Sequence, residues 1–351
     1  MLPKSALGGD VATADLATTA EALVAAGKGI LAADESSGTI AKRFESIGLE
    51  STEAHRRAYR ELLFTAGRIE AWISGVILFD ETIRQSAADG TPFPRLLEQR
   101  GIIAGIKVDT GAKALALAPG ETITEGLDGL RERLSEYREV GARFAKWRAV
   151  LSIGDGRPSE YAIWTNAHAL ARYAALSQEA GLVPIVEPEV LMDGDHAIET
   201  SFEVTSRTLH AVFTELRDQR VGLEGTLLKP NMVLAGYACR DQPEDKRVAE
   251  MTLRCLRRHV PAAVPGIVFL SGGQSDEDAT SRLNAMNTGS PQPWQLSFSY
   301  GRALQAPALK AWQGEDANAS EAQAALALRA RLNGAARSGS YEPEMERASQ
   351  V

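Results

Sequence analysis

The chain has 351 residues, of which 44% are hydrophobic and 24% are charged, a composition typical of soluble globular proteins. Its formal net charge of -8 argues against nucleic acid or an anionic membrane surface as a partner. No apolar stretch approaches the roughly 20 residues that a membrane-spanning helix needs.

The start of the chain and its few cysteine and histidine residues further narrow the class of protein that the sequence can encode. Residues 1–9 lack a basic segment followed by an apolar core, so we expect no secretory signal. Cys239 and Cys255, the only cysteines, form no CxxC pattern, and the five histidines show no HExxH spacing. These observations argue against a disulfide framework or a metal site and favour a cytoplasmic protein.

Short apolar runs bounded by turn residues alternate with amphipathic stretches along most of the chain. An N-terminal helix containing residues 21–27 precedes the first run. The apolar runs are 29–34, 72–80, 103–109, 144–151, 183–190, 225–229, 266–273 and 295–301. Helices are expected between them, including 123–140, 165–180, 196–220 and 244–259, and a last helix over 320–333.

Apolar strands that alternate with amphipathic helices predict a parallel sheet covered by helices on its outer face. Eight such units close into a (β/α)8 TIM barrel, a fold that a chain of this length fits. We therefore expect one α/β catalytic domain over residues 1–334 and a polar, mobile tail over residues 335–351. A doubly wound open sheet is the alternative, weakened by the lack of a GxGxxG loop after the first run.

Charged and polar residues gather at the carboxyl ends of the predicted strands, where barrel enzymes place their active sites. They are Asp34, Lys107, Asp109, Lys146, Arg148, Glu187, Glu189, Lys229, Asn231 and Ser271. Residues two apart on a strand share a face, so Lys146 and Arg148 are predicted to point together into the barrel mouth. The same spacing joins Glu187 to Glu189. A structural ion-pair layer is the alternative, but it explains poorly why several cations gather there.

Lys229 is the best candidate for a catalytic nucleophile, because it ends the most apolar run and directly precedes Pro230. A buried amine must be paired or neutral, and burial beside other cations favours the neutral, nucleophilic form. The same cations would attract an anionic substrate. Glu187 is the best candidate for proton transfer, since a carboxylic acid beside an apolar strand can have its pKa raised toward neutrality. Glu189 could pair with a lysine and hold it in place.

Two segments are candidates for phosphate binding. Ser271-Gly272-Gly273 offers a hydroxyl and unobstructed backbone N–H groups, and Gly301-Arg302 adds a guanidinium at the end of the next strand. Barrels often hold a phosphate between these last two loops. A second anion site could lie where Ser36 opens a helix, with Arg43 on its second turn. Simple capping of that helix by Ser36 or Ser37 is an equally supported interpretation.

These segments resemble the class I (Schiff-base) fructose-1,6-bisphosphate aldolase family. The matches run in family order along nearly the whole chain: GKGILAADES (27–36), GVILF (75–79), GIKVD (105–109), FAKWR (144–148), VPIVEPE (183–189), DGDH (193–196), LEGTLLKPNM (223–232), FLSGGQS (269–275) and FSYGRALQ (298–305). The resemblance implies a glycolytic and gluconeogenic barrel enzyme that reversibly cleaves fructose 1,6-bisphosphate to dihydroxyacetone phosphate and glyceraldehyde 3-phosphate. It also implies a homotetramer that needs no metal and no cofactor.

The resemblance assigns roles residue by residue. It implies that Lys229 forms the Schiff base and that Glu187 is the general acid and base. Asp34, Lys146 and Glu189 resemble the family's assisting residues. The C1-side phosphate is implied at Ser271, Gly272 and Arg302, and the other end of the substrate at Ser36, Arg43, Lys107 and Arg148.

One departure concerns the tail, and two other functions stay open. Family members usually carry a tail ending in a tyrosine that aids enamine protonation, whereas here the last tyrosine is Tyr341. Either Tyr341 or another group takes this role, or protonation is slow. The protein could also be a Schiff-base aldolase preferring fructose 1-phosphate or sedoheptulose bisphosphate, or an aldolase-like scaffolding protein. Two anion sites favour a bisphosphate, and intact Lys229 and Glu187 favour catalysis.

Overall fold

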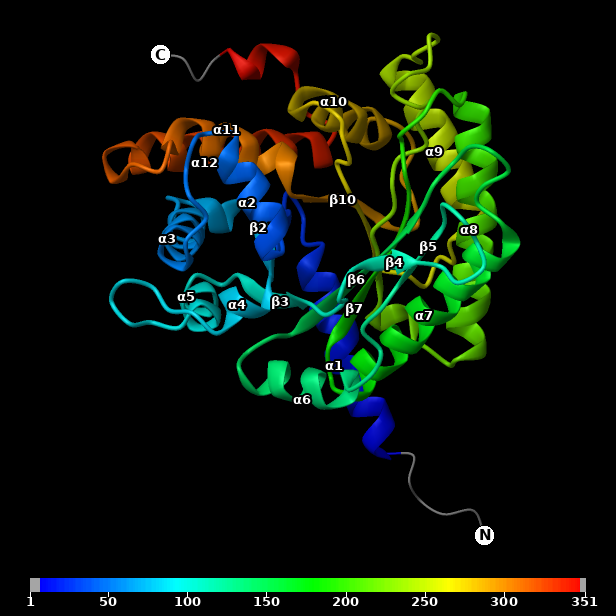
Figure 1. Ribbon diagram of the computed structural model, residues 1–351, viewed down its shortest axis with the longest axis horizontal. Coiled ribbons are helices and arrows are strands. Elements are labelled where there is room, and N and C mark those ends of the chain that lie inside the picture. The colour runs from blue at the N-terminus through cyan, green and yellow to red at the C-terminus, as the bar shows by residue number, and fades with distance from the viewer. Residues whose placement is uncertain (1–6, 348–351) are drawn as a thin grey trace.

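Eight parallel strands form a closed barrel in the computed structural model, which describes residues 7–347 (Figure 1). The strands are β1 (Gly29–Ala33), β2 (Ile73–Leu78), β3 (Ile103–Lys107), β6 (Phe144–Leu151), β7 (Val183–Val190), β8 (Leu227–Leu228), β9 (Gly266–Phe269) and β10 (Gln295–Tyr300). The barrel closes where β1 pairs with β10, with Ile30 opposite Ser299. All eight predicted strands and the (β/α)8 TIM barrel are therefore confirmed.

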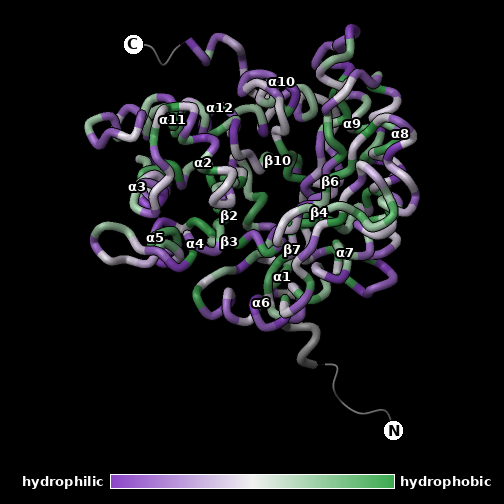
Figure 2. The backbone as a smooth tube through the Cα atoms, viewed as in Figure 1, coloured by the Kyte–Doolittle hydropathy of each residue, from purple (hydrophilic) through white to green (hydrophobic). Residues whose placement is uncertain are grey.

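Helices surround the barrel, as Figure 1 shows. They are α1 (Leu7–Leu23), α2 (Ser37–Glu45), α3 (Glu53–Phe64), α4 (Asp80–Ile83), α5 (Phe93–Gln99), α6 (Leu130–Glu139), α7 (Glu160–Glu179), α8 (Ile198–Asp218), α9 (Asp245–His259), α10 (Asp276–Asn287), α11 (Arg302–Trp312) and α12 (Ala319–Arg337). Figure 2 shows hydrophobic residues concentrated in the strands and hydrophilic residues along the outside. None of the described helices is long and apolar enough to cross a bilayer.

The amino end of the barrel is closed by an apolar plug. Leu16, Ala20 and Leu23 of α1 are buried in one cluster with strand residues such as Phe144. The fit is tight: a Cβ added at Gly105 would lie 2.3 Å from the Phe144 ring. The predicted site residues stand at the opposite, carboxyl end of the barrel.

The segment between β3 and α6 differs from the prediction. The helix expected from residue 123 begins only at Leu130, and Thr122–Thr124 instead form β5, which pairs antiparallel with β4 (Ala112–Ala114). Gly126 and Gly129 have φ angles of 124° and 64°, left-handed values that interrupt a helix and suit glycine.

The end of the chain packs against the barrel domain over its described part. Helix α12 continues to Arg337, beyond the predicted end at residue 333. Tyr341 is 7% exposed, and its hydroxyl donates to Glu346 Oε1 at 3.0 Å. Residues 348–351 of the predicted tail lie outside the described residues. The division at residue 334 stays a prediction.

Candidate active site

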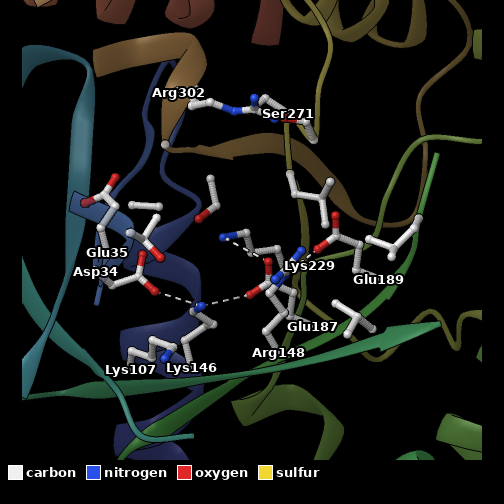
Figure 3. A pocket seen from close by; sticks show the side chains of 18 of the residues that line it. Asp34, Glu35, Lys107, Lys146, Arg148, Glu187, Glu189, Lys229, Ser271 and Arg302 are labelled. Atoms are coloured by element: carbon white, nitrogen blue, oxygen red, sulfur yellow. Dashed lines mark hydrogen bonds and ion pairs between the residues drawn. The ribbon is translucent and has the colours of Figure 1, made fainter. Parts of the chain in front are cut away.

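A cavity of about 700 Å³ opens at the carboxyl ends of the barrel strands. Every residue predicted for catalysis or phosphate binding lines it: Asp34, Ser36, Arg43, Lys107, Lys146, Arg148, Glu187, Glu189, Lys229, Ser271, Gly272, Gly273, Gly301 and Arg302. The TIM barrel brings these positions together because its parallel strands all end on the same rim. Figure 3 shows the cavity with side chains that line it, ten of which are labelled.

A row of alternating charges lies across the floor of the cavity. Lys146 Nζ, from β6, lies 2.7 Å from Asp34 Oδ2, which follows β1, and 3.2 Å from Glu187 Oε2 on β7. The other oxygen of Glu187, Oε1, lies 3.4 Å from Lys229 Nζ at the end of β8. Lys146, Glu187 and Lys229 are each at most 4% exposed. The amine of Lys229 thus has a carboxylate as its immediate neighbour in a site shielded from water.

The protonation states in this row of charges follow from competition between the cost of burying a charge and the attraction of opposite charges nearby. Burial raises the pKa of Glu187, but Lys146, Lys229 and Arg148 together outweigh it and hold the pKa below its usual value. The expectation of a raised Glu187 pKa is therefore wrong, because the strand that buries Glu187 also places it between cations. Burial likewise raises the pKa of Asp34, and the attraction of Lys146 and Lys229 overcomes it, leaving the pKa well below normal.

Lys146 is the cation that these carboxylates hold. Burial lowers its pKa, but attraction to Asp34 and Glu187 more than compensates and raises the pKa well above its usual value. Lys146 is therefore an ammonium at neutral pH, and Asp34 and Glu187 are carboxylates. Lys229 lies at the end of this row of charges, where Glu187 can exchange a proton with it.

Two further ion pairs line the wall of the cavity. Lys107 Nζ lies 3.0 Å from Asp109 Oδ1, and Arg148 pairs closely with Glu189. Glu189 was expected to pair with a lysine, but its ion-pair partner is Arg148 of the neighbouring strand β6. The cations that gather at the strand ends are therefore interleaved with carboxylates.

Backbone and side-chain donors converge after β9 and β10. Ser271 is 5% exposed, and Gly272 adopts a φ of 57°, which suits glycine. Arg302, the first residue of α11, donates to the carbonyl of Gly272. The Gly273 N–H donates to the hydroxyl of Tyr237 at 2.6 Å. This end of the cavity therefore combines a hydroxyl, N–H groups and a guanidinium.

The start of α2 forms another part of the rim. Ser36 is its N-cap residue, but its side chain makes no capping hydrogen bond and instead lies 3.1 Å from Thr39 Oγ1. The capping interpretation is therefore wrong for Ser36, which lines the cavity. Arg43 pairs closely with Glu35, and a Cβ at Gly301 would lie 3.7 Å from Arg43 Nη2. Arg43 thus lies nearer the β10 end than the resemblance implies.

Sequence reasoning missed several lining residues, notably Glu35 and Tyr237. Glu35 is 9% exposed, and its second oxygen accepts from Arg60 at 2.6 Å, so it ties the start of α2 to α3. Its signal was present, because it directly follows the strand-end residue Asp34. Tyr237 lies in a loop, and no periodic pattern in the sequence indicates that it reaches the cavity. Within residues 7–347, no group of three or more histidine, cysteine, aspartate or glutamate side chains is placed to hold a metal ion.

Comparison with known proteins gives consistent matches. A family model described as fructose-bisphosphate aldolase class-I matches residues 15–351. The chain is 59% identical over 328 residues to a probable fructose-bisphosphate aldolase class 1 of Xylella fastidiosa, covering 93% of this chain and 98% of the relative. It is 54% identical over 330 residues to fructose-bisphosphate aldolase C of Rattus norvegicus, covering 93% and 91%.

A solved structure is similar over almost its full length. It is the fructose-bisphosphate aldolase of Plasmodium falciparum, in complex with TRAP and a small-molecule inhibitor. The TM-score is 0.94 at 50% sequence identity, and the match covers 97% of each chain.

Proposed function

Because this chain belongs to the class I fructose-bisphosphate aldolase family, we propose that Lys229 is its Schiff-base nucleophile and Glu187 its general acid and base. The protein is a metal-independent lyase of glycolysis that cleaves fructose 1,6-bisphosphate. The observation that carries the residue assignment is the 3.4 Å approach of Lys229 Nζ to Glu187 Oε1 inside a buried charge network.

The first half of the reaction joins the sugar to the enzyme. Glu187 takes a proton from Lys229, whose neutral amine attacks the C2 ketone carbon and forms a carbinolamine. Glu187 then returns a proton to the carbinolamine hydroxyl, which leaves as water and gives an iminium. The positive iminium nitrogen lies beside the Glu187 carboxylate once that proton has been delivered, which stabilises the charge.

The second half breaks the C3–C4 bond. A carboxylate removes the C4 hydroxyl proton, the bond electrons move into the iminium, and the aldehyde leaves as an enamine forms. We assign this step to Glu187, because it is a carboxylate once water has left and it lies beside the reacting nitrogen, 3.4 Å from Lys229 Nζ. Protonation and hydrolysis of the enamine then release dihydroxyacetone phosphate and free Lys229.

Anion-binding groups on two sides of Lys229 support a substrate with two phosphates. Figure 3 shows Ser271 and Arg302 on one side and Lys107 and Arg148 on the other. We assign the C1-side phosphate to Ser271, Gly272, Gly301, Arg302 and Arg43, with Gly273 beside it, and the opposite phosphate to Ser36, Lys107 and Arg148. This arrangement favours a bisphosphate over fructose 1-phosphate, and comparison of kcat/KM for the two sugars tests it. Equal values would contradict the assignment.

The substitution Lys229→Met tests the nucleophile. It removes the amine while keeping a side chain of similar length, so cleavage should be lost and the circular dichroism spectrum retained. The matched control is Lys113→Met, because Lys113 is exposed on β4 and does not line the cavity. Turnover close to wild type in Lys229→Met would rule out Lys229 as the nucleophile. Glu187→Gln should lower kcat strongly and leave inhibition by inorganic phosphate unchanged.

The assembly and location of the protein are further parts of the proposal. A homotetramer is supported by the family resemblance and by exposed apolar side chains, notably Leu117 at the tip of the β4–β5 hairpin and Trp164 on α7. A cytoplasmic location fits a glycolytic enzyme with two free cysteines, and the acidic net charge argues against nucleic acid or an anionic membrane as partner. Light scattering should give four chain masses, and a monomer at assay concentration would contradict the tetramer.

A further inference from the structure

Tyr237 stands at the C1-phosphate end of the cavity but has no role in the mechanism above. It lies in the loop after β8, lines the cavity and is 47% exposed. Its own N–H donates to the carbonyl of Met192 at 2.9 Å, and the N–H of Ala238 donates to that of Gly194 at 2.8 Å. The loop is therefore fixed by backbone hydrogen bonds, and the ring is presented to the cavity from a defined position.

The hydroxyl of Tyr237 lies directly against the phosphate-binding segment. It accepts the Gly273 N–H at 2.6 Å, and a Cβ added at Gly273 would lie 2.5 Å from the same oxygen. Ser271 and Gly272, which offer their own donors, directly precede Gly273. A phosphate bound by that segment and by Arg302 would therefore lie close to the Tyr237 oxygen.

The proton of this hydroxyl is available for a stronger acceptor. Because the oxygen accepts from Gly273, its O–H must point elsewhere, and the partner found for it is Met192 Sδ at 3.6 Å. A thioether is a weak acceptor, whereas a phosphate oxygen is a strong one. A hydroxyl that already accepts a hydrogen bond is also polarised toward donating one.

The phenol keeps its proton at neutral pH. Burial raises the pKa of Tyr237, and the hydrogen bond from Gly273 and the positive charge of Arg302 only partly offset this effect. The group facing the phosphate is therefore a neutral donor, and its ionised form would repel the ligand.

We propose that Tyr237 is an additional ligand of the C1-side phosphate, donating its O–H to a phosphate oxygen while it still accepts the Gly273 N–H. The proposal rests on the assignment of that phosphate to the segment after β9. Tyr237 makes no contact with Lys229 or Glu187 among the interactions of the described residues, so its contribution is to phosphate affinity and not to proton transfer at the reacting carbons.

The first test compares Tyr237→Phe with Tyr161→Phe, whose ring on α7 is similarly exposed, at 50%, and does not line the cavity. Tyr237→Phe should raise the inhibition constant of inorganic phosphate and the KM for fructose 1,6-bisphosphate by roughly tenfold each, the loss expected for one hydrogen bond to a charged group. Its kcat should stay unchanged, as should all constants of the control. Unchanged phosphate inhibition in Tyr237→Phe would overturn the proposal.

Failure of this proposal is separable from failure of the mechanism. Dihydroxyacetone carries no phosphate, so its trapping on Lys229 by borohydride tests the nucleophile alone. Trapping should be equal in wild type and Tyr237→Phe. A loss of trapping confined to Tyr237→Phe would show that Tyr237 acts at the reacting carbon and would overturn a role in phosphate binding.

A second variant distinguishes whether Tyr237 binds the phosphate directly or only supports the loop that contains Gly273, a role we call a brace. Replacement of Tyr237 by 3,5-difluorotyrosine makes the hydroxyl a stronger donor, a weaker acceptor and more acidic. Sulfate is the probe, because it stays a dianion across the pH range. If Tyr237 binds the phosphate, the fluorinated variant should bind sulfate at least as tightly as wild type at low pH. It should then lose sulfate affinity as the pH rises through the pKa of the phenol. Weaker binding at every pH, without that step, would indicate a brace and overturn the proposal.

Discussion

Substitution of Lys146 by methionine should destabilise the protein and impair catalysis for the same electrostatic reason. The Lys146 ammonium lies between two buried carboxylates, 2.7 Å from Asp34 Oδ2 and 3.2 Å from Glu187 Oε2. Methionine fills a similar volume but carries no charge. The variant therefore leaves two carboxylates in the barrel with much of their compensation removed.

The size of the effect follows from these distances. At an effective dielectric constant of about 20, the two attractions amount to about 6 and 5 kcal/mol, and the cost of burying the three charges offsets most of that sum. Breaking a buried ion pair by removing one partner costs about 3–5 kcal/mol. We expect a loss of that order in the free energy of unfolding at pH 7.

The loss should depend on pH in a defined direction. The pKa values of Asp34 and Glu187 lie below their usual values of 3.8 and 4.5, so their pairing stabilises the fold above those values. The stabilisation fades as pH falls through the lower, folded pKa values. The difference between Lys146→Met and wild type should therefore be largest near neutral pH and should shrink below about pH 4.

Urea unfolding of wild type, Lys146→Met and the exposed control Lys113→Met measures this directly. The double variant Lys146→Met/Asp34→Asn should recover part of the loss, because it removes one unpaired carboxylate. The acid limb of kcat/KM should move to higher pH in Lys146→Met, since the pKa of Glu187 rises when its strongest cation is removed. A pH-independent loss below 1 kcal/mol, or no recovery in the double variant, would refute the electrostatic reasoning.

Three more predictions follow from single contacts. Arg302→Met should raise the KM for fructose 1,6-bisphosphate at least tenfold, since it removes a charged phosphate donor; an unchanged KM in steady-state assays would contradict this. Gly105→Ala should lower the free energy of unfolding by about 1–3 kcal/mol, because its Cβ would lie 2.3 Å from the Phe144 ring, and unchanged urea unfolding would exclude the clash. Glu35→Gln should weaken the hold on Arg43 and raise the KM more than it lowers kcat, whereas an effect on kcat alone would contradict a positioning role.

The barrel was predictable because each strand is marked by a local run of apolar residues. Runs such as residues 144–151 and 183–190 are largely apolar and each carries two charged residues two positions apart, and the strands of the structure have these same bounds. The β4–β5 hairpin was missed because Ala112–Ala114 are exposed and show no apolar alternation. The start of α6 was placed too early because Gly126 and Gly129 interrupt an otherwise helical pattern.

The membership of the site was also predictable, but its charge pairing was not. Parallel strands end on one rim, so the strand-end residues had to meet. Which cation faces which carboxylate depends on distances across the barrel: Lys146 reaches Asp34, although β6 and β1 are not neighbours in the sheet. The position of Lys146 beside Glu187, together with Lys229 and Arg148, is what keeps the pKa of Glu187 low. Tyr237 approaches from a loop, whose path no sequence periodicity encodes.

The central claim is that Lys229 forms a covalent imine with the keto sugar and that no metal takes part. Borohydride reduction in the presence of dihydroxyacetone phosphate, with and without EDTA, followed by peptide mass mapping, tests it most directly. Activity should disappear irreversibly, with one reduced adduct on Lys229 and no effect of EDTA. An unlabelled Lys229, or turnover that ceases with EDTA alone, would contradict it.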